Sequence, residues 1–90
     1  MQRIPPLVLV EWEDSTQPVA AWQFLDQIEN AAAILCQSVG FLIHDGADAK
    51  TLAPNVGEIG TGRAQASGVV QIPTRSIRRI RKLNLGRSAP

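Results

Sequence analysis

The sequence predicts one mainly β domain, a small five-stranded barrel with a short helix between its first two strands. Five runs of apolar and β-branched residues are separated by turn residues, which is typical of a small all-β domain. A glycine stands inside the longest run, where a strand that serves both halves of a closed sheet has to bend. With 90 residues the chain forms a single domain over 1–90, with the barrel at about 7–83.

The first strand is predicted at residues 7–12, an apolar run that follows two prolines and precedes a polar stretch. In residues 19–30, Trp22, Leu25 and Ile28 stand three positions apart with polar residues between them. That spacing predicts a short helix with one apolar face. An extended loop is the alternative for this segment.

Residues 32–44 form the longest predicted strand, because large apolar side chains alternate along it with small or polar ones. Gly40 marks the bend in this strand. Asp45 and Gly46 then predict a hairpin turn into a third strand at 49–53.

The second half of the chain predicts two more strands. Residues 55–63 contain three glycines and are expected to form a flexible connection to a fourth strand at 64–72. A tight turn at 73–76, one turn of 3₁₀ helix, leads to the last strand at 77–83. The tail at 84–90 is expected to fray.

The residue types for catalysis are scarce in this chain. Cys36 and His44 are single, tyrosine is absent and the carboxylates are scattered, so we expect no enzyme and no catalytic residues. A zinc site would lack its second thiolate or imidazole, and neither metal nor another cofactor is expected. Cys36 lies within an apolar alternation and is expected to be a small buried residue.

The compartment predicted from the sequence is the cytoplasm. No apolar stretch approaches the ~20 residues that span a bilayer, and residues 1–9 lack the pattern of a signal peptide. With one cysteine, no disulfide can form within the chain. We therefore expect no membrane partner.

Charge is separated along the chain. Residues 1–62 carry eight acidic and two basic residues, a net −6, whereas residues 63–90 carry seven basic residues and no acid, a net +7. Such separation suits a polyanionic ligand, or the contact of a basic edge with the acidic surface of another subunit. Cations on an edge strand that only prevent aggregation are the alternative.

The expected strand order resembles that of SH3-like and Sm-like small barrels. The resemblance rests on Gly40, on the turn at Asp45 and Gly46, and on the junction from Ile72 through Pro73. Residues 10–15, 38–43 and 72–77 are also similar to stretches of a family of small phage and prophage proteins. That family has no agreed activity, but phage accessory proteins imply two functions: acting on nucleic acid or antagonising a host defence.

Two functions are therefore expected. The first is a homo-oligomeric interaction or sequestration module that binds a host protein or a small phosphorylated nucleotide. Arg75 and Arg78 would hold the phosphate by bidentate hydrogen bonds, and Trp22 or Phe41 would stack on the base. Oligomerisation is expected because a domain of this size buries little surface alone.

The second function is a nucleic-acid-binding barrel. The Sm-like resemblance implies contacts from the loop at His44 and Asp45 and from the loop at Thr74 and Arg75. The nearly neutral net charge and the acids beside His44 weigh against it. A solvated hairpin end explains His44 more simply.

The glycine-rich segment 57–63 could also close over an anion, since glycine lets backbone N–H groups approach a phosphate. Thr61 and Arg63 would then contact the phosphate. A plain hairpin loop is the favoured interpretation, because the segment lacks the Gly-Lys-Ser/Thr signature.

Overall fold

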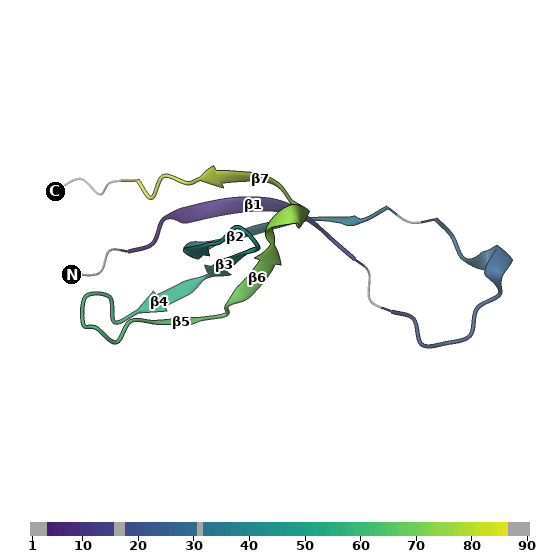
Figure 1. Cartoon of the computed structure of the whole chain (residues 1–90), viewed down its shortest axis with the longest axis horizontal. Coiled ribbons are helices and arrows are strands. Elements are labelled where there is room, and N and C mark those ends of the chain that lie inside the picture. The colour runs from purple at the N-terminus through teal and green to yellow at the C-terminus, as the bar shows by residue number, and fades with distance from the viewer. Residues whose placement is uncertain (1–3, 16–17, 31, 87–90) are drawn as a thin grey trace.

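The computed structural model describes residues 4–15, 18–30 and 32–86, and its fold is mainly β (Figure 1). Five strands form one antiparallel sheet in the order β6-β3-β2-β1-β7, and β4 pairs with β5 in a two-stranded ribbon. The elements are β1 (Leu7–Asp14), η1 (Leu25–Gln27), β2 (Ile34–Asp45), β3 (Ala49–Ala53), β4 (Asn55–Gly57), β5 (Gln65–Ser67), β6 (Val70–Pro73), η2 (Thr74–Ser76) and β7 (Ile77–Lys82).

Strand β2 confirms the predicted long strand and its bend. It pairs with β1 through Phe41 and takes up pairing with β3 from Phe41 onward, so the partner changes next to Gly40. Gly40 is buried, and a Cβ atom there would lie 3.1 Å from the carbonyl oxygen of Ala53. Only a residue without a side chain lets β3 approach this closely.

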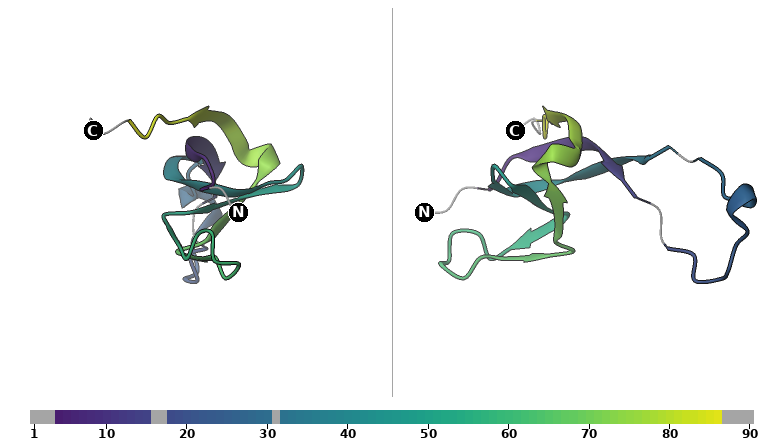
Figure 2. Two further views of the ribbon diagram at one scale, coloured as in Figure 1. Left: turned by 90° about the vertical axis from the view of Figure 1, so that its left-hand side faces the viewer. Right: turned by 45° about the vertical axis from the view of Figure 1, so that its right-hand side comes forward.

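The expected closed barrel is not found. Among the described residues, β6 pairs only with β3 and β7 pairs only with β1, so no ladder joins the two edges of the sheet. β6 is short because Gly68, at a φ of 73°, interrupts the expected strand 64–72, and Pro73 at its end has no N–H to donate. The 3₁₀ turn η2 crosses from one edge to the other, as the sequence predicts (Figure 2).

The prediction of a helix within residues 19–30 is wrong. The segment is extended apart from the single turn η1, and its residues are exposed. We call residues 18–30 the arm, because they reach away from the sheet (Figures 1 and 2). No sheet face lies beside the arm to bury an apolar stripe, and a helix this short is marginal without tertiary packing.

The core is small. Val8 and Val10 of β1 pack with Leu52 of β3 and Ile72 of β6, and each is at most 4% exposed. Partly buried side chains close around this cluster: Trp12, Leu42 and Ile77. The indole Nε1 of Trp12 donates a hydrogen bond to Ser38 Oγ at 3.0 Å, which ties β1 to β2 beside the core.

The ribbon of β4 and β5 replaces the flexible connection expected at 55–63. At its tip, the N–H and the hydroxyl of Thr61 both donate to the carbonyl oxygen of Glu58, at 3.3 and 2.7 Å. The connection is therefore a hydrogen-bonded hairpin. Within the described residues, no helix is long and apolar enough to cross a bilayer.

Candidate binding site at the basic edge

The turn η2 is fixed to the hairpin between β2 and β3. The N–H of Thr74 donates to the carbonyl oxygen of Asp48 at 2.9 Å, and its hydroxyl donates to the carbonyl oxygen of Gly46 at 3.0 Å. Lys50 in turn forms an ion pair with Asp45 across the hairpin. The loops at 45–48 and 74–76 thus form one surface. The N–H and the hydroxyl of Thr74 are both engaged in joining these loops.

Strand β7 carries four of the nine basic residues of the chain, and it is an edge strand of the sheet. Arg79 lies opposite Glu11 of β1, whereas Arg81 lies opposite Leu9, so no acid faces Arg81 from the neighbouring strand. We call the cations of η2 and β7 the basic edge; all are exposed, and they are Arg75, Arg78, Arg79, Arg81 and Lys82.

The two arginines predicted to hold phosphate lie next to carboxylates. Arg78 Nη1 lies 3.3 Å from Glu13 Oε1, in an ion pair whose side chains are both about half exposed. Arg75 lines an open groove of about 520 Å³ that Glu13 and Asp14 also line. A phosphate at Arg75 and Arg78 would therefore compete with these acids, whereas Arg79, Arg81 and Lys82 form no ion pair within the described part of the chain.

The aromatic residues predicted to stack on a base do not join this site. Trp22 is fully exposed on the arm, which reaches away from η2 in Figure 1 and in the right-hand view of Figure 2. Phe41 is half-buried in β2 opposite Leu7. Within one chain, the predicted combination of arginines and a stacking aromatic is not assembled.

The remaining predicted residues lie in two other places. The hydroxyl of Thr61 donates a hydrogen bond to the carbonyl oxygen of Glu58. The hydroxyl oxygen of Thr61 also accepts a hydrogen bond from the backbone N–H of Arg63, at 3.2 Å. These contacts build the tip of a hairpin and engage the hydroxyl of Thr61. His44 is exposed near the end of β2, where it pairs with Thr51 of β3, two positions before Gly46.

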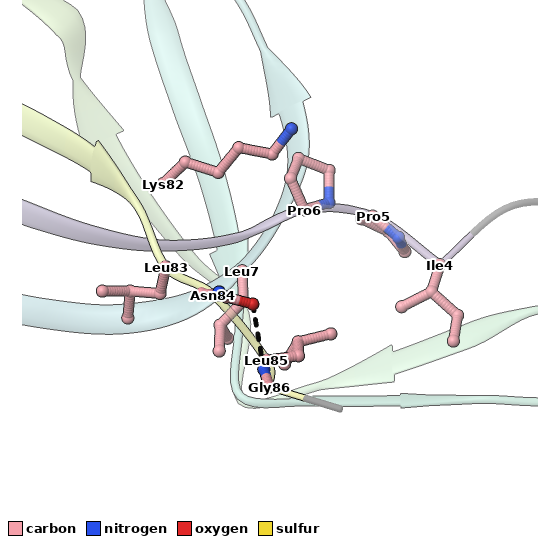
Figure 3. A pocket seen from close by; sticks show the side chains of 9 residues that line it. All are labelled: Ile4, Pro5, Pro6, Leu7, Lys82, Leu83, Asn84, Leu85 and Gly86. Atoms are coloured by element: carbon pink, nitrogen blue, oxygen red, sulfur yellow. Dashed lines mark hydrogen bonds between the residues drawn. The ribbon is translucent and has the colours of Figure 1, made fainter. Parts of the chain in front are cut away.

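A groove of about 800 Å³ continues the basic edge (Figure 3). Residues 4–7 form one wall and residues 82–86 the other, and the N–H of Leu83 donates to the carbonyl oxygen of Leu7 at 2.8 Å. Lys82 reaches over Pro6 at its rim. Prolines and leucines make up much of the lining, so the groove adds apolar surface beside a single cation.

An apolar surface that the sequence does not reveal covers the side of β1 and β2 turned away from the core. Residues opposite each other in a ladder share a face. Val8 and Val10 face the core, so Leu9 and its partner Val39 point the other way. We call this side the outer face; its apolar residues are Leu7, Leu9, Leu35, Val39 and Phe41, and Glu11, Glu13 and Gln37 lie on the same side.

The single cysteine and histidine are not placed together for chemistry. Cys36 lies opposite Trp12 on the core side of β2, and a bulge before His44 turns that residue to the other side. Within the described residues, no three of the histidine, cysteine, aspartate and glutamate side chains are grouped to hold a metal. Comparisons with protein-family models, with curated proteins and with solved structures gave no match for this chain.

Proposed function

We propose that this protein is a non-enzymatic binding module that works as a homo-oligomer and takes an anionic, phosphorylated ligand on its basic edge. One observation carries the proposal: five exposed cations follow one another along η2 and the edge strand β7. Only Arg78 among them has an ion-pair partner in the described structure. Arginine donors in such a row suit the oxygens of a phosphate group.

The position of the cations favours Arg81 and Lys82 as the strongest contacts, followed by Arg79, which lies opposite Glu11. Arg75 and Arg78 share their surroundings with Glu13 and Asp14, so a ligand there gains less from Coulomb attraction. The ligand proposed from the phage-type resemblance is a phosphorylated nucleotide that serves as a signal in a host defence. Its compartment would be the host cytoplasm.

A second candidate is a nucleic-acid-binding barrel of the SH3-like or Sm-like kind. The contact of η2 with the hairpin at 46–48 favours it, because the Sm-like resemblance brings these two loops together at the nucleic acid. The carboxylates of Asp45 and Asp48 oppose it, since they repel a phosphate backbone at the same surface. A sheet that β6 and β7 leave open also departs from a closed barrel.

Thermal unfolding with candidate ligands tests both functions. A mono-, di- or cyclic nucleotide at about 100 times its Kd should stabilise the protein by about 2.7 kcal/mol. Replacing Arg79 and Arg81 with alanine should abolish that shift, and replacing Arg75 and Arg78 should reduce it less. Arg63→Ala is the matched control, because Arg63 is an exposed arginine at the tip of the ribbon.

The outcomes separate the two candidates. Steeply salt-dependent binding to oligonucleotides, with no effect of mononucleotides, would support the nucleic-acid module. If neither ligand binds at low salt, or if Arg63→Ala weakens binding as much as the β7 variants do, the basic edge only protects the sheet from aggregation.

A further inference from the structure

The arm presents an unusual amount of apolar surface to solvent. Two of the four aromatic residues of the chain, Trp22 and Phe24, lie on it, and Leu25 is 87% exposed. By contrast, the core contains no fully buried aromatic side chain among the described residues. A contiguous apolar segment of this kind marks an interaction surface.

The outer face of β1 and β2 is a second apolar surface without a cover. Val39 is 55% exposed and Leu35 is 59% exposed. Leu9 and Phe41 lie beside them and are half-buried. The alternation along β2 therefore directs its large side chains outward and leaves Cys36 and Ser38 for the side that Trp12 packs against.

The accessible area is larger than that of a compact monomer of the same mass. It is 7610 Å², whereas a folded monomer of this mass exposes about 5,100 Å², roughly 2,500 Å² less. The radius of gyration is 17.8 Å, against about 12 Å for a compact domain of this length. Obligate dimers bury 2,000 Å² or more in total, so the excess area of each chain is sufficient for such an interface.

Charge indicates which surfaces meet. The arm carries Asp26 and Glu29 and no basic residue. The outer face is bordered by β7, where Arg79 and Arg81 share its side of the sheet because they lie opposite Glu11 and Leu9. Attraction to the acids of the arm comes from Arg81, opposite Leu9, whereas Glu11 and Glu13 on the same face repel them, so charge favours the Leu9 end of the face.

One edge of strand β2 next to the outer face also has backbone groups that a second chain could pair with. Residues 34–39 pair with β1 along one edge, while pairing with β3 begins only at Phe41. Within the described strands, the second edge of this segment has no partner, so its N–H and C=O groups can bind an extended segment. The arm is extended on both sides of η1.

We propose that the protein is a two-fold dimer in which the arm of each copy lies on the outer face of β1 and β2 of the other copy. This inference rests on the homo-oligomer in the proposed function and names its interface. The arm leads away from its own sheet (Figure 1), so a second copy related by a two-fold axis can receive it. Exchange in both directions covers both apolar surfaces of each chain.

Light scattering and sedimentation equilibrium on the full chain test the dimer. The double variant W22D/L25D removes the apolar contacts of the arm, and V39D removes those of the face. Each should raise the dimer dissociation constant by about 100-fold or more, because aromatic and aliphatic anchors dominate interfaces. Circular dichroism shows whether a variant folds, and V69D is the matched control, since Val69 is 51% exposed on the turn between β5 and β6.

A mixing experiment distinguishes arm exchange from other assemblies. The arm variant and the face variant, each monomeric alone, should form a mixed dimer, since one intact arm still meets one intact face. Failure of the mixture to associate, or a dimer that persists in W22D/L25D, overturns the arm exchange while leaving the homo-oligomer and the anion site intact. A wild-type chain that stays monomeric at high concentration overturns the homo-oligomer as well. Arg79 and Arg81 belong to the basic edge and also border the outer face, so nucleotide binding is measured on the monomeric variants, in which no partner arm contacts these arginines.

Discussion

Replacing Gly40 tests whether the close approach at the bend of β2 shapes the sheet. A methyl group there would lie 3.1 Å from the carbonyl oxygen of Ala53 and 3.2 Å from its carbon atom. Optimal contacts between nonbonded heavy atoms are about 3.5–4.0 Å. Both strands are hydrogen-bonded in the same sheet, so β2 and β3 would have to separate by a few tenths of an ångström.

The expected cost follows from two opposing terms. Overpacking of a closely packed site costs about 1–3 kcal/mol, and the stiffer unfolded chain of an alanine variant returns about 0.4–1 kcal/mol. Gly40→Ala should therefore destabilise the protein by about 1–2 kcal/mol. In a domain of this size that corresponds to a Tm about 5–15 °C lower. Gly40→Val places two further carbon atoms against β3 and should cost more.

The assay is thermal and urea unfolding followed by far-UV circular dichroism at one fixed protein concentration, because association changes the apparent Tm. Gly57→Ala is the control, since a Cβ atom at Gly57 meets nothing within 4 Å. It should leave stability unchanged or raise it by up to about 1 kcal/mol. A Gly40→Ala protein as stable as this control would refute the close approach of β3.

Two further predictions concern side-chain contacts. A double-mutant cycle with Trp12→Phe and Ser38→Ala should give a coupling energy of about 0.5–1.5 kcal/mol, because the indole N–H donates to the hydroxyl at 3.0 Å beside the core; additive effects would contradict that bond. Glu13→Gln should cost less than about 1 kcal/mol in urea unfolding, since its ion pair with Arg78 is about half exposed. Any cost should shrink at high salt, and a larger, salt-independent loss would show a different role for Glu13.

The strand pattern could be predicted from the sequence where local rules and packing agree. The run after Pro6, the bend at Gly40, the turn at Gly46 and the 3₁₀ turn after Pro73 all stand where the residues predict them. Each of these features depends on a property of one residue or on a short apolar run, so it could be predicted without knowledge of the tertiary contacts.

The arm and the site could not be predicted in this way. Three apolar residues at helical spacing, from Trp22 to Ile28, form a helix only when another surface buries them, and the single chain offers none. Alternation along β2 predicts a strand, but which of its faces turns inward depends on Trp12, which lies opposite Cys36 and donates to Ser38 on the core side. The run of cations in the sequence likewise pointed to Arg75 and Arg78. It could not show that Glu13 forms an ion pair with Arg78 and lines the same groove as Arg75, where it competes with an anionic ligand.

The position of residues 4–7 and 82–86 along one groove has a practical consequence. The two segments are joined by the hydrogen bond between Leu83 and Leu7, on the side of the molecule remote from the arm (Figure 1). A short peptide could therefore bridge them, and new ends opened within the arm would give a circular permutant that keeps every strand pair. An affinity handle on that side would anchor the domain to a sensor chip with the arm pointing into solution.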